Sequence, residues 1–175
     1  MSAVPNEAQA ARVSARAGAA NDDKFLTFCL GKEEFGLPIL VVREIIGIID
    51  ITPVPSMPEY VKGVINLRGR IIPVVELRSK FHMPSVPFTA ETCIIVVEVL
   101  GAGGSVYQIG AIVDNVREVL DIPRQSIQPP AALGAGVPLD FILGLGKVKS
   151  RVVILLDINS VGMLGGIPAP SQIAA

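Results

Sequence analysis

The sequence predicts an all-β protein made of two copies of one β-rich unit. From Phe25 onward the apolar residues come in short Val, Ile and Leu runs that Gly and Pro interrupt, a pattern that favours strands of about five residues over helices. These runs recur about every 8 to 12 residues, which is the spacing of small sandwiches and barrels. Two blocks of sequence also occur twice in the same order, which indicates an internal duplication.

The duplicated blocks align without internal gaps. Phe35–Ile46 lies over Ile109–Leu120 at a spacing of 109 − 35 = 74, and Tyr60–Leu77 lies over Phe141–Ile158 at a spacing of 141 − 60 = 81. The longer second spacing fits an insertion in the loop Pro123–Leu139. Because a sheet of short strands must hide its edges, we expect each copy to close into a small barrel and the two barrels to share a hydrophobic core.

The first strand is expected in the alternating segment Lys24–Leu30. It follows an Ala-rich tail, residues 1–22, which has no sustained periodicity and is expected to be disordered. The dipeptide Glu33-Glu34 is expected at the tip of the turn to the next strand, which begins near Phe35.

Later turns and loops follow from Pro and Gly. Three prolines in Thr52–Pro58 exclude a central strand there, because proline cannot donate a ladder hydrogen bond, so this stretch is predicted as an edge or a connecting loop. Leu67–Arg70 is predicted as a tight turn in which Gly69 supplies a positive φ. Leu77–His82 is predicted as a short helix, and residues 166–175 as a C-terminal tail.

Composition excludes several classes of function. The net charge of −1 gives no broad attraction to phosphate, so the sequence predicts no nucleic-acid partner. The mean hydropathy of +0.56 is high, yet the longest weakly charged stretch, Thr92–Val113, is broken by Glu98 and by Gly101–Ser105, whereas a membrane-spanning helix needs about 20 apolar residues. We expect no direct membrane insertion, no secretory signal and a cytoplasmic protein.

Catalytic and metal-binding motifs are not apparent in the sequence. His82 is the single histidine, and the two cysteines, Cys29 and Cys93, are too far apart to complete a zinc set. The carboxylates Asp50, Asp114 and Asp157 have no visible partner. We therefore expect no catalytic residue, no metal and no cofactor, although an enzyme with a dispersed site stays open as an alternative that a deep polar pocket around His82 or Asp114 would favour.

The most specific motif is the turn Asn-Leu-Arg-Gly, which lies in Gly63–Gly69 and is followed by Ile72–Arg78, Ile-Pro-Val-Val-Glu-Leu-Arg. Together with Phe35–Ile39, Val42–Ile45 and Ile109–Asp114 in the expected order, these segments resemble the CheW family of chemotaxis coupling proteins. The resemblance covers about Lys24 to Leu164 and implies one CheW-like domain at 23–165. It also implies two five-stranded SH3-like β-barrels around a shared hydrophobic core, with few short helices.

The resemblance implies a function as well. Proteins of this family are non-catalytic adaptors that join the cytoplasmic tip of a methyl-accepting chemoreceptor to the regulatory domain of the histidine kinase CheA. The expected location is therefore the cytoplasm, with recruitment to membrane-associated receptor arrays. The same domain in another chemosensory-like pathway, such as one for surface motility or transcriptional control, stays open as an alternative.

The resemblance also assigns roles to residues. Those matched to the receptor-binding surface are Val42, Glu44, Arg68 and Val116. The turn at Asp50–Pro58, with Asp50, Ile51 and Val54, is expected at the kinase-binding surface. Four glycines are assigned to backbone geometry and not to contact: Gly63, Gly69, Gly110 and Gly144.

Three of the four receptor-binding assignments have a plainer alternative. Val42 either contacts the receptor or packs in the core, as most β-branched residues do. Glu44 either meets a basic group of a partner or pairs with Arg43 or Arg70, and Arg68 is otherwise a solvated arginine beside Gly69. Because Lys149-Ser150 replaces Arg68-Gly69 in the second copy, only the first copy is expected to carry the arginine function.

Overall fold

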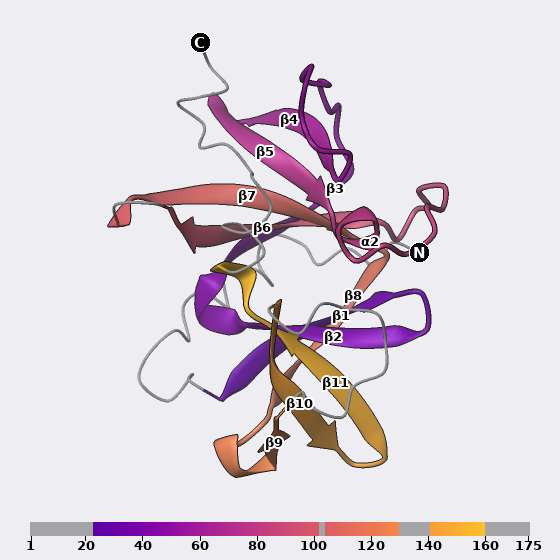
Figure 1. The fold of residues 1–175 in the computed structure, drawn as a ribbon, viewed down its shortest axis with the longest axis vertical. Helices are drawn as coiled ribbons and strands as arrows, with labels where there is room; N and C mark the ends of the chain where they lie inside the picture. The colour runs from indigo at the N-terminus through magenta and orange to yellow at the C-terminus, as the bar shows by residue number, and fades with distance from the viewer. Residues whose placement is uncertain (1–22, 102–103, 130–140, 160–175) are drawn as a thin grey trace.

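The computed structural model describes residues 23–101, 104–129 and 141–159 (Figure 1). Within these residues the chain forms two β-sheets and a few short helical turns. The expected tails at 1–22 and 166–175 lie outside the described residues.

The first sheet has six strands. Their order is β8 (Asn115–Asp121), β1 (Lys24–Leu30), β2 (Glu33–Pro38), β11 (Arg151–Leu156), β10 (Ile142–Val148) and β9 (Ile127–Gln128). Neighbours run antiparallel except for β2 and β11, which are parallel. The turn between β1 and β2 lies at Gly31-Lys32, so the sequence placed it two residues too late, and Glu33-Glu34 opens β2 instead. Glu34 is buried, and the nearby basic group of Arg151, 3.5 Å from its carboxylate, offsets the cost of burying the charge.

The second sheet has five strands. Their order is β3 (Val42–Gly47), β6 (Cys93–Leu100), β7 (Val106–Val113), β5 (Arg70–Glu76) and β4 (Val61–Leu67), with β5 and β7 parallel. The short helical elements are η2 (Ile39–Val41), α2 (Leu77–Lys80) and η4 (Arg124–Ser126). The predicted helix at Leu77–His82 is confirmed in its first four residues, and Thr52 makes a single bridge to Val64 at the edge of β4, as the prolines after it require.

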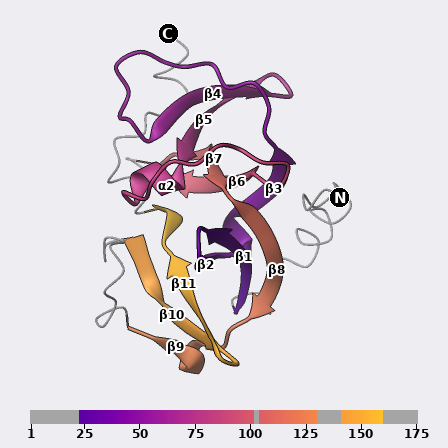
Figure 2. The same ribbon diagram turned by 90° about the vertical axis from the view of Figure 1, so that its right-hand side faces the viewer.

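The duplication predicted from the sequence is confirmed strand by strand. The strands β1 to β5 correspond to β6, β7, β8, β10 and β11, and both sheets show the same order of corresponding strands. Even irregularities recur, since the register shift at Val61/Gly63 between β4 and β5 has its counterpart at Ile142/Gly144 between β10 and β11. The two sheets are therefore two versions of one arrangement, stacked one on the other (Figure 2).

The expectation that each copy closes its own barrel is wrong. The six-stranded sheet takes β1 and β2 from the first copy and the rest from the second, while the five-stranded sheet takes β3, β4 and β5 from the first copy and β6 and β7 from the second. The exchange occurs because the parallel pairings β2–β11 and β5–β7 each join one copy to the other. Within the described residues, the strand pairing of either sheet does not return from the last strand to the first, so both are open barrels.

The shared core lies between the sheets. A ladder of aromatic rings runs through it, from Phe28 to Phe35, Phe81 and Phe141, with successive ring centroids 5.7, 5.8 and 5.9 Å apart. Each sheet also encloses a smaller apolar cluster of its own. The all-β architecture of two related halves around one shared core is thus as the sequence predicted. None of the helices in the described ranges has the length and apolar character needed to cross a bilayer.

Cys93 offers a direct test of this core. Its side chain is fully buried in β6, and burial raises the pKa of its thiol to about 12, although a hydrogen bond from the backbone of Val116 partly opposes this. Because the thiolate is the reactive form, we expect iodoacetamide at pH 8 to leave Cys93 unmodified in a folded Cys29→Ser variant and to modify it after denaturation in urea. Mass spectrometry after timed labelling measures this. Labelling of folded protein at the rate of a small free thiol would contradict the burial.

Candidate functional site

The hairpin between β4 and β5 ends in a two-residue turn. Leu67 pairs with Arg70, and the residues between them, Arg68 and Gly69, have φ values of +53° and +82°. Positive φ at both positions is the signature of a type I′ turn, and the Asn66 side-chain oxygen accepts a hydrogen bond of 2.9 Å from the Gly69 N–H. A left-handed conformation costs a non-glycine residue about 1–2 kcal/mol, so the turn holds Arg68 in a backbone conformation that is unfavourable for an arginine.

Arg68 is held by Glu44. Two parallel hydrogen bonds, of 2.6 and 2.7 Å, join the Arg68 guanidinium to the two carboxylate oxygens of Glu44 on β3. These hydrogen bonds lower the pKa of Glu44 below its ordinary value against the opposing effect of partial burial. Glu44 is 21% exposed and Arg68 is 62% exposed, so the arginine remains open to solvent. The sequence suggested Arg43 or Arg70 as the partner of Glu44, and the structure shows neither in that role.

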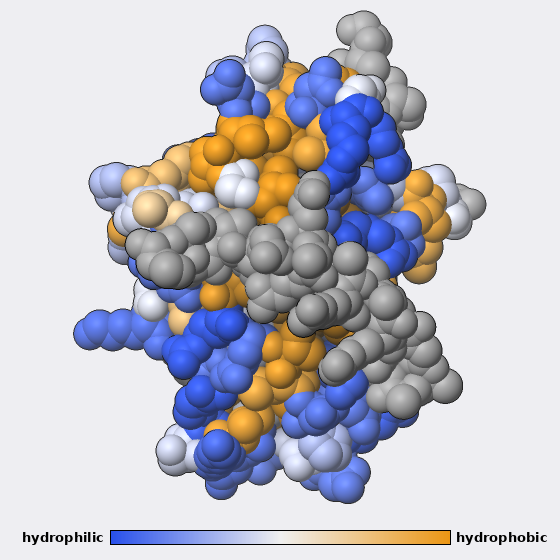
Figure 3. All heavy atoms as spheres, turned by 180° about the vertical axis from the view of Figure 1, so that it is seen from behind, coloured by the Kyte–Doolittle hydropathy of each residue, from blue (hydrophilic) through white to orange (hydrophobic). Residues whose placement is uncertain are grey.

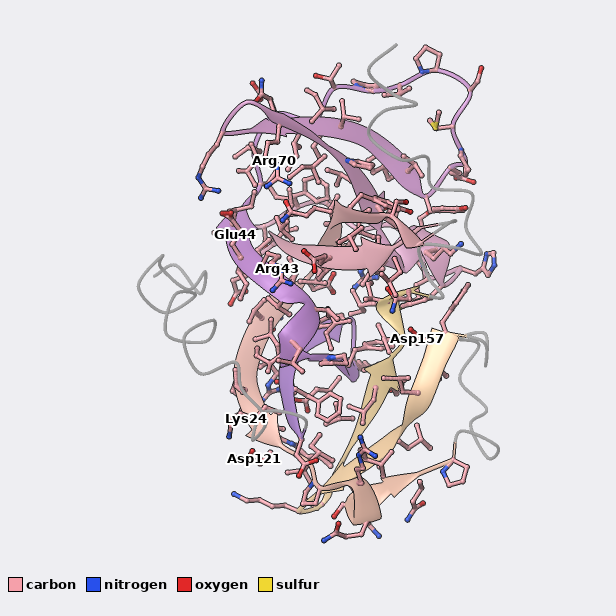
Figure 4. All side chains as sticks on the ribbon, turned by 90° about the vertical axis from the view of Figure 1, so that its left-hand side faces the viewer. Lys24, Arg43, Glu44, Arg70, Asp121 and Asp157 are labelled. Atoms are coloured by element: carbon pink, nitrogen blue, oxygen red, sulfur yellow. The ribbon has the colours of Figure 1, made fainter. Side chains whose placement is uncertain are left out.

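A second ion pair continues the row of charges. Arg43 donates hydrogen bonds of 2.7 and 3.3 Å to the carboxylate of Glu98 on β6, and these bonds lower the pKa of Glu98. Figure 4 shows Arg43 and Glu44 next to each other on β3, with Arg70 beyond them. Arg68, Glu44, Arg43 and Glu98 together form a surface of alternating charge, which we call the charged face.

The second copy carries a looser version of the charged face. Glu118 on β8 lies 3.3 Å from Arg151, and the buried Glu34 carboxylate lies 3.5 Å from Arg151 and 3.8 Å from Arg117. Lys149, the counterpart of Arg68, also has a positive φ, of +56°. The two copies thus kept a two-residue turn with a positive φ at its first position, but Ser150 has no positive φ where Gly69 has one, so both the turn type and the side chains differ.

Val42 and Val116 lie in the core. Val42 is 4% exposed and Val116 is 9% exposed, and both belong to the cluster between the sheets. Of the two roles that the sequence left open for Val42, receptor contact and core packing, the structure shows core packing. Val42 is the first residue of β3 and Val116 the second residue of β8, and each strand is the outer strand of its sheet. Packing of the two valines in the core therefore holds β3 and β8 in place.

Asp50, Ile51 and Val54 lie on the connection from β3 to β4. Asp50 is exposed, and Ile51 and Val54 are half-buried. Beside them, half-buried apolar side chains pack against the cluster inside the five-stranded sheet and leave one edge open to solvent: Ile46, Ile48, Ile51 and Leu67. Figure 3 shows apolar side chains gathered on the upper part of the molecule, where β3, β4 and β5 lie. We call this group the apolar end.

The assigned glycines lie where another chain segment passes closely. A Cβ on Gly63, which has φ +144°, would overlap the Thr52 carbonyl, and a Cβ on its counterpart Gly144 would come within 2.5 Å of an Ile127 methyl group. A Cβ on Gly110 would lie 2.7 Å from Ile94, whereas Gly69 has open space and is required for its φ alone. Gly63 thus lets the β3–β4 connection cross next to β4.

Asp114 is a residue that the sequence misjudged. Its carboxylate is not isolated, because Arg78 donates two hydrogen bonds to it, of 2.8 and 2.6 Å, and the Gly31 N–H donates a third, of 2.7 Å. Burial alone raises the pKa of Asp114, but the hydrogen bonds from Arg78 and Gly31 outweigh it and lower the pKa below its ordinary value. No sequence signal could reveal this pairing, because Arg78 and Asp114 lie far apart in the chain with no motif that links them. Asp157, too, has a partner, the Asn159 N–H at 3.1 Å.

The pocket beside Asp114 is small. Glu76, Arg78 and Asp114 line it together with apolar residues such as Phe88, and its water-accessible space is about 10 Å³, enough for about one water molecule. His82 does not line this pocket. In the described part of the chain, no three His, Cys, Asp or Glu side chains come together as metal ligands. The deep polar pocket that would favour a dispersed catalytic site is not what the structure has at Asp114.

Comparisons with known proteins agree with this fold. A family model described as "CheW-like domain" matches residues 24–162. The chain is 38% identical over 149 residues to "Chemotaxis protein CheW" of Klebsiella aerogenes, covering 85% of this chain and 87% of that protein. It is 33% identical over 138 residues to "Chemotaxis protein CheW" of Rhizobium meliloti, covering 79% and 86%.

A solved structure is also similar. The crystal structure of scaffolding protein TtCheW from Thermoanaerobacter tengcongensis matches with a TM-score of 0.71 and 35% sequence identity, over 78% of this chain and 89% of that one. The similarity thus extends over both sheets and most of the length of each relative. On the family match and these relatives, the chain belongs to the CheW-like domain family.

Proposed function

We propose that this protein is a non-catalytic adaptor that couples the cytoplasmic tips of chemoreceptors to the regulatory domain of the histidine kinase CheA. Membership of the CheW-like domain family and the likeness to a scaffolding protein support this proposal. The observation that carries it is Arg68, an exposed arginine held in a strained turn at the most specific motif of the chain. The adaptor works in the cytoplasm and is recruited to receptor arrays by its partners.

The charged face is the proposed receptor-binding surface. Arg68 presents a planar guanidinium that suits bidentate recognition of a carboxylate on the partner. Glu44 and Arg43 add charges of both signs, which favour one register of the partner over others. Val42 and Val116 contribute by fixing their strands, since their own side chains are buried.

The apolar end is the proposed kinase-binding surface. Ile51 and Val54 are half-buried next to the exposed Asp50, so the connection offers apolar area with a charge at its rim. Interfaces of this composition bury an apolar centre and leave polar groups around it. Two separate surfaces let one molecule contact receptor and kinase together, and the kinase then responds to the receptor only as far as these contacts differ between signalling states.

Reversal of charge at Arg68 tests the proposed function. In Arg68→Glu a carboxylate replaces the guanidinium opposite Glu44, so both the proposed receptor contact and the local ion pair become repulsive. We expect receptor-dependent activation of kinase autophosphorylation to fall at least about tenfold, which corresponds to about 1.4 kcal/mol of binding free energy. The measurement is phosphate incorporation with receptor-containing membranes, kinase and this protein.

Lys149→Glu is the matched control. Lys149 occupies the corresponding turn of the second copy with nearly the same φ, and it is exposed as well. We expect Lys149→Glu to retain kinase activation, and circular dichroism should show both variants folded. Equal activity of Arg68→Glu and the wild type, or a failure of the wild-type protein to bind the kinase domain, would contradict the proposed function.

A further inference from the structure

Lys80, the last residue of α2, is a buried lysine without a counter-charge. It is 7% exposed. In the part of the chain that the structure describes, no hydrogen bond or ion pair reaches its ammonium group. Burial lowers the pKa of Lys80, and no neighbouring charge counteracts this effect. Because lysine is seldom buried unless it is paired, a buried ammonium of this kind is suited to receive a partner from outside the chain.

Two aromatic rings contact the ammonium of Lys80. Its Nζ lies 4.0 Å from the centroid of the Tyr60 ring and 5.0 Å from the centroid of the Phe141 ring. Tyr60 and Phe141 are counterparts in the duplicated blocks, at the spacing of 141 − 60 = 81, so the charge lies where the two halves of the molecule meet. The cation–π contacts offset part of the cost of burial, but they leave the N–H groups of the ammonium without an oxygen acceptor.

The hydroxyl group of Tyr60 is a second unused donor beside this ammonium. Within the described ranges it makes no hydrogen bond. Burial raises the pKa of Tyr60, so the hydroxyl keeps its proton at neutral pH. Both donor atoms are open to solvent, since neither is among the fully buried polar atoms that lack a hydrogen bond. An ammonium and a hydroxyl are therefore available side by side to one acceptor group.

We propose that Lys80 and Tyr60 form a binding site for a single carboxylate. A carboxylate carries one negative charge and two acceptor oxygens, which match one ammonium and one neighbouring hydroxyl. One ammonium does not balance the charge of nearly −2 on a phosphate group. Figure 2 shows α2 on the opposite side of the molecule from β3, so the site lies apart from the charged face and adds a contact beyond the proposed function.

Titration of the full-length protein with acetate tests the site. NMR of isotope-labelled lysine Cε atoms follows each ammonium, and sodium chloride at equal ionic strength is the reference. We expect the Lys80 signal to shift with a Kd of about 10 mM, the strength of one charge-assisted hydrogen bond. The pKa of Lys80 should rise toward its ordinary value, because a bound anion favours the charged form. Lys62 is the internal control, since a carboxylate oxygen of Glu76 already lies 3.3 Å from its ammonium.

Tyr60→Phe separates the hydroxyl from the ring. The variant keeps the aromatic contact with Lys80, as Phe141 does in the other half, so we expect the Kd for acetate to rise about fivefold. Lys80→Met keeps an apolar side chain of similar length, and the ring signals of Tyr60 should then no longer respond to acetate. Circular dichroism should show both variants folded. Absence of an acetate-specific shift of Lys80 in the wild type, or an unchanged Kd in Tyr60→Phe, overturns the site.

Binding to the partner proteins identifies the source of the carboxylate, and this step alone rests on the proposed function. If an acidic side chain of the kinase regulatory domain or of the receptor tip fills the site, Lys80→Met should bind that partner about tenfold more weakly than the wild type. Acetate, compared with chloride, should then weaken binding of the wild type and not of Lys80→Met.

Unchanged partner binding, together with the acetate shift, assigns the site to a small free carboxylate. If the wild-type protein binds neither partner, the proposed function fails, whereas the acetate titration still decides whether Lys80 and Tyr60 form the site.

Discussion

Gly63→Ala is expected to lower the free energy of unfolding by about 4 kcal/mol. A φ of +144° is unfavourable for any residue with a Cβ, at a cost of about 1–3 kcal/mol, and the added methyl group would overlap the Thr52 carbonyl and lie 2.9 Å from Pro53 Cα. Because these neighbouring atoms belong to the backbone, a rotamer change cannot relieve the overlap, so strain of about 1–3 kcal/mol adds to the conformational cost. Urea denaturation followed by circular dichroism measures the loss.

Alanine substitutions at two other glycines provide the comparison for this prediction. Gly144→Ala, at the corresponding place in the second copy, is expected to cost less, about 2 kcal/mol, because Gly144 has no positive φ, so only the contacts of the added Cβ with an Ile127 methyl group and the Gln128 carbonyl, at 2.5 and 2.9 Å, oppose the change. Gly47→Ala serves as the control, since nothing lies within 4 Å of its added Cβ, and its effect should stay within about 0.5 kcal/mol. If Gly63→Ala were as stable as Gly47→Ala, the close crossing of the connection over β4 would be refuted.

Asp114→Ala is expected to cost about 3 kcal/mol of unfolding free energy. Arg78 is 11% exposed and Asp114 is 24% exposed, so removal of the carboxylate leaves the mostly buried guanidinium with the Pro84 carbonyl as its acceptor but without its counter-charge, and takes the acceptor from the Gly31 N–H. Asp114 also lies between β7 and β8, where the chain passes from one sheet to the other, while Gly31 belongs to the turn of the six-stranded sheet. The loss should therefore act on both sheets, and thermal denaturation should remain a single transition.

The pH dependence gives this prediction a second readout. The pKa of Asp114 is lowered in the folded protein, so its contribution to stability is fully present above the unfolded pKa, about 3.9, and is lost as the pH falls through the folded value. The difference between wild type and Asp114→Asn should thus be constant near neutral pH and shrink below about pH 4. Asp121→Ala is the control, because the Lys24–Asp121 pair (Figure 4) leaves Asp121 66% exposed and should cost less than about 1 kcal/mol. Equal losses in Asp114→Ala and Asp121→Ala would contradict the role given to Asp114.

The sequence predicted the strands better than their partners. Short apolar runs and the repeated blocks identify β2, β3, β4 and β5 and their counterparts, because side-chain periodicity depends on the strand itself. Which strand lies beside which depends on contacts between distant segments, so the exchange of strands between the copies could not be read from the periodicity. The repeat did predict that the two sheets would share one arrangement.

The candidate site was predictable where the motif is local. The turn at Arg68 follows from Asn66 and Gly69, whose side-chain acceptor and positive φ are encoded within four residues. The partner of Arg68 was not predictable, because it depends on the direction in which the turn aims the guanidinium across to Glu44 on β3. Asp114 was missed for the same reason, since its acceptor role depends on Arg78 and on a backbone N–H of another strand pair.

The exchange of strands between the copies sets an order of assembly during synthesis. All strands of the five-stranded sheet come from one continuous stretch, Val42 to Val113, and can pair as soon as that stretch has left the ribosome. The hairpin of β1 and β2 precedes that stretch, but its other sheet neighbours, β8 and β11, are made after it. The hairpin of β1 and β2 should accordingly gain protection later than the five-stranded sheet when the nascent chain folds, although it is translated before that sheet.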